Sequence, residues 1–145
     1  MSTNIELVLG ILKDEVWGDI SAALQKMSDD YSMTWMYKGK LEIFPESKKD
    51  LKEELQEVYP IKGRRYEIKN IAEGENVVMV ELVESYPNSE NGGLHQTPLV
   101  LVLEMEEGKI KTGRHYCDPQ LSYEKLSSGD LEKAYKNTST KIVIE

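Results

Sequence analysis

Hydrophobic residues recur at helical spacing through the first quarter of the chain. One run comprises Ile5, Val8, Leu9, Leu12 and Val16, and the next comprises Ile20, Ala23, Leu24 and Met27. This spacing predicts two helices, with Asp19 as a candidate N-cap of the second. An aromatic, Met-rich strand is expected over residues 31–37. A third helix is expected to begin at Ser47 and to end before Pro60.

The remainder of the chain has a predominantly β pattern. Strand-like runs cover residues 66–71, 77–86, 99–105 and 110–118, and the turn-forming stretches AEGEN, PNSENGG and EEGK separate them. Hairpin-linked neighbours predict an antiparallel meander. Residues 121–136 are expected to mix loop and helix, and the closing IVIE is a candidate edge strand. The pattern predicts one α+β domain over residues 1–145, with N-terminal helices packed on a curved antiparallel sheet and a concave space for a ligand.

The hairpin around Glu107-Gly108 predicts a register for its two strands. A two-residue turn there pairs Glu106 with Lys109, and counting back pairs Val100 with His115. Alternation then places His115 on one face with Val100 and Val102, and Arg114 and Tyr116 on the other with Leu101 and Leu103. Both faces are substantially apolar, so a homodimer built on the exposed sheet face is a further hypothesis.

Composition narrows the possible partners. The 145 residues are 39% hydrophobic and 30% charged, with a net charge of −8, which indicates a globular chain unsuited to nucleic acid or anionic membranes. The N-terminus resembles neither a signal peptide nor a membrane span, and the single cysteine agrees with a cytoplasmic location. No zinc-ligand spacing or phosphate-binding loop is present in the sequence, so neither a metal nor a cofactor is expected.

The predicted order of elements and the segment EGKIKTGRHYCD resemble the NTF2-like superfamily, in its SnoaL-like, ketosteroid-isomerase-related branch. The resemblance covers roughly residues 5–125 and implies an α+β cone, also called cystatin-like, with a deep apolar pocket. Its members include dimers, isomerases, polyketide cyclases, epoxide hydrolases and domains without a known reaction. The hairpin segment is similar to that of limonene-epoxide-hydrolase-type enzymes, in which a catalytic aspartate directly follows the arginine.

His115 holds that aspartate's position here, and Glu84 is the closest equivalent of the second acid. Leu82 stands where those enzymes place an arginine that orients the acids. In ketosteroid-isomerase-type enzymes the base follows an Asp-Asp pair, and Trp35 occupies that position after Asp29-Asp30. The resemblance therefore implies a pocket more firmly than it implies a reaction.

His115 and Glu84 are the candidate catalytic residues. Imidazole titrates near neutrality, and a nearby carboxylate would raise its pKa and fix its tautomer. Glu84 shares its strand face with apolar residues, so its carboxylate requires a partner. Glu81, on the other face of the strand, is the competing candidate for the catalytic acid. The alternatives are purely structural. In these, His115 only ends a strand, and Glu84 is a solvated acid at a strand end. The candidate substrate-pocket residues are Trp17, Trp35, Tyr31, Tyr116 and Leu82.

These features lead to two alternative functions. The first is a pocket that binds a small apolar molecule and acts on it by isomerase, cyclase or hydrolase chemistry, with His115 transferring protons and Glu84 as its partner. The second is a non-catalytic ligand-binding or protein-interaction module. Whether the chain is an enzyme therefore stays open at the level of sequence. Convergence of polar side chains on an open cavity would distinguish the two.

Overall fold

The computed structural model describes residues 3–36, 42–44, 52–53, 56, 62–87, 90, 92–118 and 128–145. Two helices open the described chain, α1 (Thr3–Trp17) and α2 (Ile20–Gln25). The Asp19 carboxylate accepts a hydrogen bond from the backbone N–H of Ala22, which confirms Asp19 as the cap of α2. Most of the third helix expected between Ser47 and Pro60 lies outside the described residues.

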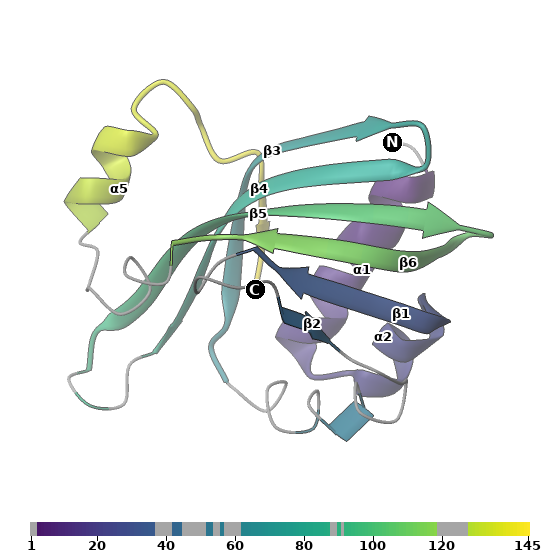
Figure 1. Cartoon of the computed structure of the whole chain (residues 1–145). Helices are drawn as coiled ribbons and strands as arrows, with labels where there is room; N and C mark the ends of the chain where they lie inside the picture. Colours follow the sequence, from purple (N-terminus) through teal and green to yellow (C-terminus); the bar gives the residue numbers. More distant parts are fainter. Residues whose placement is uncertain are drawn as a thin grey trace.

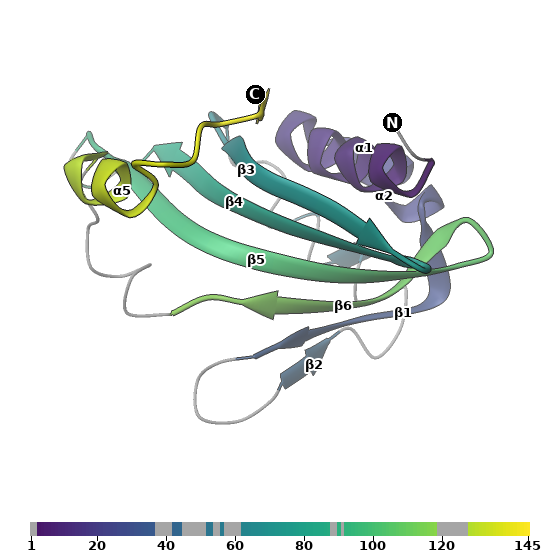
Figure 2. The same cartoon turned by 90° about the horizontal axis from the view of Figure 1, so that it is seen from above.

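The described strands form one seven-stranded sheet in the order β2-β1-β6-β5-β4-β3-β7. They are β1 (Met27–Trp35), β2 (Glu42–Phe44), β3 (Arg65–Gly74), β4 (Val77–Pro87), β5 (Leu94–Glu106), β6 (Lys109–Tyr116) and β7 (Ile142–Ile144). The sheet curves strongly, and α1 runs across one side of it near β3 (Figures 1 and 2). This arrangement confirms the predicted α+β architecture of helices on a curved sheet. The expected edge strand at the end of the chain is β7, which pairs with β3.

The sheet is mixed and not wholly antiparallel. Strands β3 to β6 form the predicted meander, but β1 pairs with β6 in parallel, with Met33 opposite Gly113. Nearly eighty residues separate these two positions, enough chain to return to the same end of the sheet before β6 begins. Hairpin signals in the sequence report only the antiparallel neighbours, so this parallel contact could not be predicted from them.

The hydrophobic core lies between α1 and one side of the sheet. Val8 and Leu12 of α1 are buried there against fully buried strand residues such as Ile68, Val80 and Leu82. We call the sheet side that carries these three strand residues the inner face, and the opposite side the outer face. Helix α1 contacts β3, β4 and β7, so it covers one edge of the inner face.

The predicted register of the β5–β6 hairpin is correct at its turn and wrong beyond it. Glu106 pairs with Lys109 across a turn in which Glu107 and Gly108 both have positive φ. A β-bulge then intervenes, so that Glu104 pairs with Thr112 and Leu101 pairs with His115. The extra residue exchanges the two faces of β6 relative to β5. His115 therefore shares a face with Leu101 and not with Val100.

The same bulge places the alternate residues of β6 on the outer face. Arg114 lies opposite Val102 there, and its guanidinium forms a 3.1 Å ion pair with Glu104. The expected grouping of Arg114 and Tyr116 with Leu101 and Leu103 is therefore wrong. Helix α5 (Ser128–Ala134) falls within the segment predicted to mix loop and helix.

Candidate functional site

His115 projects from the inner face near the end of β6. Its neighbours across the sheet are Leu101 on β5 and Trp35 on β1. The Trp35 and His115 rings are tilted by 38° with centroids 6.4 Å apart. The His115 carbonyl accepts a 3.0 Å hydrogen bond from the Met36 backbone N–H, which ties the end of β1 to β6. An imidazole and an indole thus lie together on the inner face.

Burial lowers the pKa of His115 from 6.5 to about 4, partly offset by a backbone hydrogen bond. The side chain is therefore a neutral imidazole near pH 7. This is opposite to the increase expected from a neighbouring carboxylate, and no carboxylate contributes to the shift. In its neutral form the ring can donate one hydrogen bond and accept another.

Glu84 also projects from the inner face, on β4 opposite Tyr66 of β3. The Tyr66 hydroxyl donates a 3.0 Å hydrogen bond to Glu84 Oε2. The Arg64 guanidinium lies 3.9 Å from the same oxygen through Nε, and its Nη1 forms a 2.9 Å ion pair with Oε1 of Glu15 in α1. We call Glu15, Arg64, Tyr66 and Glu84 the acid cluster.

The structure places His115 and Glu84 on one face without pairing them. Glu84 lies opposite Thr97 of β5, whereas His115 lies opposite Leu101, four positions further along the same strand. At strand geometry this offset is about 13 Å along the sheet and about 10 Å across it. A direct hydrogen bond between the two side chains is therefore out of reach.

Glu15 has a raised pKa because it is buried. Burial is the largest cause and repulsion by Glu84 the second, and attraction by Arg64 only partly offsets them, so the Glu15 pKa rises from 4.5 to about 7. The same surroundings raise the pKa of the Tyr66 hydroxyl well above 10. Near neutral pH, Tyr66 is therefore protonated and Glu15 is divided between its acid and its carboxylate forms.

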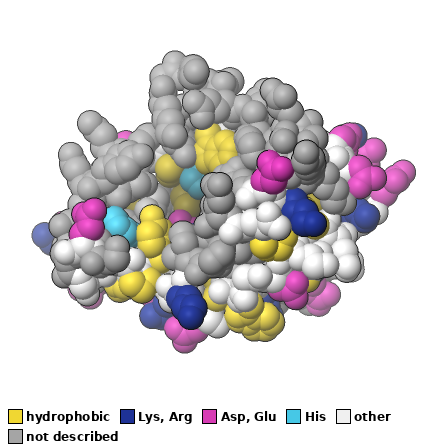
Figure 3. Space-filling model, turned by 90° about the horizontal axis from the view of Figure 1, so that it is seen from below, with side chains coloured by type: hydrophobic (Ala, Val, Ile, Leu, Met, Phe, Trp, Pro, Cys, Tyr) yellow, Lys and Arg dark blue, Asp and Glu magenta, His cyan; other side chains and the backbone are white. Residues whose placement is uncertain are grey.

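A hollow opens on the face of the molecule shown in Figure 3. Hydrophobic side chains gather in it, together with a histidine and an acidic side chain. Such a combination of apolar walls and a few polar groups is typical of small-molecule sites. Among the described residues, no cluster of His, Cys, Asp and Glu is suited to hold a metal ion. No helix in the described ranges is long and apolar enough to cross a membrane.

No family model matches the chain, and no curated protein matches its sequence. Solved structures do match the chain in fold. An NTF2-like protein of unknown function from Cytophaga hutchinsonii aligns with a TM-score of 0.65 at 16% identity, covering 86% of this chain and 97% of its own. The chain has the NTF2-like fold.

Two further structures with this fold extend the comparison. TerC co-crystallized with polyporic acid aligns with a TM-score of 0.69 at 20% identity, covering 86% of this chain and 98% of TerC. An LEH-like epoxide hydrolase from M. tuberculosis aligns with a TM-score of 0.67 at 17% identity, covering 91% of this chain and 95% of the hydrolase. At these identities the likeness establishes the fold of the chain, as the sequence resemblance predicted.

The expected pocket residues occupy different parts of the NTF2-like fold. Leu82 is fully buried in the core, Tyr31 is 8% exposed, and Trp35 is next to His115 on the inner face. Trp17 is 69% exposed at the end of α1, where its indole N–H donates to the Glu145 carbonyl at 3.4 Å. Tyr116 is 39% exposed and lies opposite Val100, on the outer face. The first three residues thus belong to the side of the sheet that carries His115 and Glu84.

Sequence reasoning missed Glu15, Arg64 and Tyr66. A signal for Glu15 was available, because it follows Val8 by seven positions and so falls on the apolar stripe of α1. The adjacent Arg64 and Arg65 gave no such signal. Which of the two arginines reaches inward depends on where β3 begins, and the structure buries Arg64.

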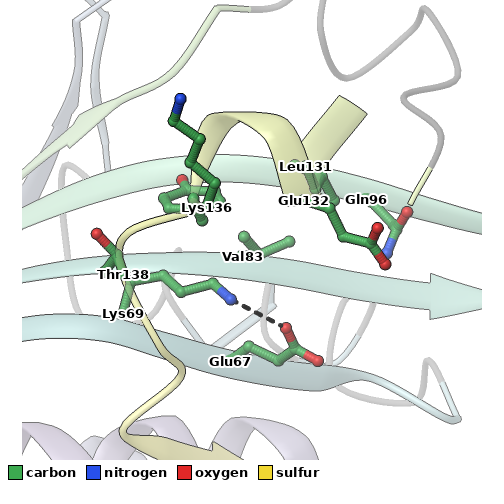
Figure 4. A pocket seen from close by; sticks show the side chains of 9 residues that line it. Glu67, Lys69, Val83, Gln96, Leu131, Glu132, Lys136 and Thr138 are labelled. Atoms are coloured by element: carbon green, nitrogen blue, oxygen red, sulfur yellow. Dashed lines mark hydrogen bonds and ion pairs between the residues drawn. The ribbon is translucent and has the colours of Figure 1, made fainter. Parts of the chain in front are cut away.

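A second cavity lies on the outer face, between α5 and strands β3 to β5 of the NTF2-like sheet. It encloses about 520 Å³ and includes Lys69, Glu67, Val83 and Leu131 in its lining. Figure 4 shows the Lys69 ammonium directed toward Glu67, at 3.5 Å, and the same ammonium bonds the Thr140 hydroxyl at 2.7 Å. The Lys69 ammonium of this cleft is thus held by Glu67 and Thr140, and none of the predicted site residues lines the cleft.

Proposed function

We propose that this chain binds a small, largely apolar molecule on the inner face of its sheet and moves a proton on it by acid/base chemistry. The observation that carries the proposal is the position of His115 and Glu84, which project from the same otherwise hydrophobic face. Trp35, Tyr31 and Leu82 contribute aromatic and aliphatic surface on that side. No metal or cofactor is needed for such a reaction.

The distance between the two polar groups assigns them to different ends of the ligand. Neutral His115 positions a polar atom of the ligand by a hydrogen bond. Glu84, which accepts a hydrogen bond from Tyr66, acts as the proton acceptor. A ligand spanning both groups would be about the size of two or three fused rings. The structures of an LEH-like epoxide hydrolase and of TerC co-crystallized with polyporic acid support the use of this fold for reactions and for small molecules.

A non-catalytic binding module is the second candidate. The lowered pKa of His115 favours it, because a group with a pKa near 4 is poorly matched to proton transfer at neutral pH. In that function the imidazole and the acid cluster would only orient a ligand. The two candidates share the same site and differ in whether substitution at Glu84 changes turnover or only affinity.

We further propose that the chain is a cytoplasmic homodimer whose copies meet through the outer face. Met79 is 51% exposed there, and Tyr116 adds aromatic surface. Analytical ultracentrifugation at micromolar concentration should give a dimer, and Met79→Glu should shift it toward monomer. A monomeric wild-type protein under these conditions would contradict this part of the proposal.

The two tryptophans provide the test of ligand binding, with 2-tetralone, a bicyclic aromatic ketone, as the probe. In a ¹H–¹⁵N NMR titration the Trp35 indole and the His115 imidazole should shift in a saturable way. The backbone amide of Glu104 on the outer face serves as the internal control and should not move, whereas Trp17, two residues from Glu15, reports on the acid-cluster end of the site. His115→Ala should weaken binding about tenfold, whereas His95→Ala, next to Tyr86 on the β4–β5 hairpin, should not. Equal shifts of the Trp35 indole and the Glu104 amide would contradict a specific site.

A further inference from the structure

Two carboxyl groups from different elements meet a single guanidinium in the acid cluster. We propose that Glu15 and Glu84 form one acid/base pair joined through Tyr66, which acts on an enolisable carbonyl compound. Glu15 holds the proton to be donated, and Glu84 accepts the proton to be removed. This inference rests on the proposed function, because it names the chemistry and the substrate class of the same inner-face site.

Counting hydrogen-bond donors indicates that the cluster needs a proton besides that of Tyr66. A tyrosine hydroxyl has one proton to donate, and Tyr66 donates it to Glu84 at 3.0 Å. The same hydroxyl also interacts with the Glu15 side chain. One phenol proton is therefore shared between two carboxyl groups, and both bonds can form at once only if one carboxyl keeps a proton. Burial disfavours the charged form of Glu15 most strongly, so we assign this proton to Glu15.

The charges in the cluster favour the same arrangement. Arg64 brings one positive charge within 2.9 Å of Glu15 and 3.9 Å of Glu84. A second ionised carboxylate would leave this partly buried site with an excess negative charge, which two nearby acids avoid by retaining one proton. The raised pKa of Glu15 agrees with this geometry, because Glu84 is one of its causes.

Exposure separates the groups that could reach a ligand from those that hold them in place. The side chains of Glu15 and Glu84 are 24% and 22% exposed, whereas Arg64 is 4% exposed. Tyr66 is buried as well. Both acidic side chains therefore keep partial contact with solvent, although Glu15 is largely buried, while the guanidinium and the phenol that position them are enclosed. A purely structural ion pair between α1 and the sheet would not require two accessible acids.

The proposed step is a balanced proton exchange on a carbonyl compound. Ionised Glu84 takes a proton from the carbon next to the carbonyl group, while Glu15 gives its proton to the carbonyl oxygen. The substrate C–H bond and the Glu15 O–H bond break, and the Glu84 O–H bond and the enol O–H bond form. Glu84 then passes its proton to the Tyr66 oxygen as Tyr66 passes its own to Glu15, which restores the pair. Addition of a solvent proton to carbon, with loss of the enol O–H proton to solvent, regenerates the carbonyl group and completes an exchange or an isomerisation.

The shared proton can be tested without any substrate. In protein labelled with ¹³C at the glutamate carboxyl, a pH titration by NMR should show one carboxyl with its midpoint near pH 7, absent in Glu15→Gln. The midpoint should move down by at least half a unit in Glu84→Gln, because a repelling charge is removed. It should stay in place in Glu104→Gln, where the acid lies on the outer face. A Glu15 midpoint near 4.5 in wild type, or one unaffected by Glu84→Gln, would overturn the pair.

The chemistry can be tested by deuterium exchange of 2-tetralone at C1 in D₂O, monitored by proton NMR. Wild type should accelerate exchange over buffer, with kcat falling as pH rises through about 7. We expect Glu84→Gln to lose at least 100-fold and Glu15→Gln at least 10-fold, the latter with the fall near pH 7 abolished. Glu104→Gln should match wild type.

The outcomes separate this inference from the proposed function. Exchange that requires His115 and is unaffected by Glu15→Gln would overturn the acid/base pair and leave the proposed function standing. Saturable binding that shifts the carboxyl signals of Glu15 and Glu84 without accelerated exchange would also overturn the pair, and would favour the binding module. Failure of 2-tetralone to bind would contradict the proposed function, while the carboxyl titration would still report on the shared proton.

Discussion

The acid cluster and the His115–Trp35 site lie on the same side of one sheet, but they are built differently. The acid cluster ties α1 to β3 and β4 through an ion pair and a hydrogen bond, and two of its four members are acids. His115 packs against an indole, and no carboxylate shifts its pKa. One region is held together by charge, and the other by apolar contact.

In both regions burial disfavours the charged form of an ionisable side chain, but the resulting pKa shifts have opposite signs. It raises the pKa of Glu15 to about 7 and lowers that of His115 to about 4, because in each case it penalises the charged form. Near neutral pH the inner face therefore carries fewer charges than its titratable residues suggest. A neutral, largely apolar ligand is better suited to such a face than an ionic one.

The largest expected effect comes from removing the charge that holds the acid cluster together. Arg64→Met leaves Glu15 and Glu84 close to each other without their cation, and we expect a loss of about 3–5 kcal/mol in the free energy of unfolding. The loss should be greater at pH 8 than at pH 5, where Glu15 is protonated. Urea denaturation at the two pH values measures it.

Arg114→Met is the matched control for that substitution. Arg114 also pairs with a glutamate, Glu104, but on the outer face where both side chains are substantially exposed. Exposed pairs of this kind contribute about 0–1 kcal/mol, so we expect a small loss with little dependence on pH. Equal losses in the two variants would contradict the importance of burial in the acid cluster.

The second prediction is that the two regions give opposing pH dependences of stability. Folded Glu15 binds its proton more tightly than the unfolded chain does, so it destabilises the fold as pH rises from about 4.5 to 7. Folded His115 binds its proton more weakly, so it stabilises the fold as pH rises from about 4 to 6.5. Each effect is at most about 3 kcal/mol. They largely offset each other in wild type.

Single substitutions should separate these two contributions. Relative to wild type, Glu15→Gln should gain stability as pH rises through its window, and His115→Gln should lose it. The free energy of unfolding of the three proteins, measured by urea denaturation at intervals from pH 4 to 8, gives both differences. Parallel curves for all three proteins would show that neither group is neutralised by folding.

The sequence predicted the elements of both regions better than it predicted their contacts. The turn at Glu107-Gly108 was predicted correctly because Gly108 readily adopts the positive φ that a two-residue hairpin turn requires. The bulge that follows it has no comparable signal, and it alone decides which side of the sheet receives His115. Alternation is an exact rule within a strand, so one unpaired residue reverses every side chain beyond it.

The acid cluster illustrates a second limit of sequence reasoning. Glu84 was predicted as an acid that requires a partner, and it does have partners, although they are not His115. Its contacts come from residues 15, 64 and 66, and only the curvature of β3 and β4 beneath α1 brings them together. Non-local contacts between a helix and strands about fifty to seventy positions away leave no periodic pattern in a single sequence.

The smallest expected effect tests whether the two regions respond independently. A side chain at Gly113 would come within 2.8 Å of Met33 Cε and 2.9 Å of Leu103 Cδ2, next to His115 and away from the acid cluster. Because both contacts are with ends of flexible side chains, Gly113→Ala should cost only about 1 kcal/mol of stability. The Trp35 indole resonance should move, whereas the Glu15 carboxyl should keep its midpoint near pH 7. A displaced Glu15 midpoint would mean that packing couples the two regions across the inner face.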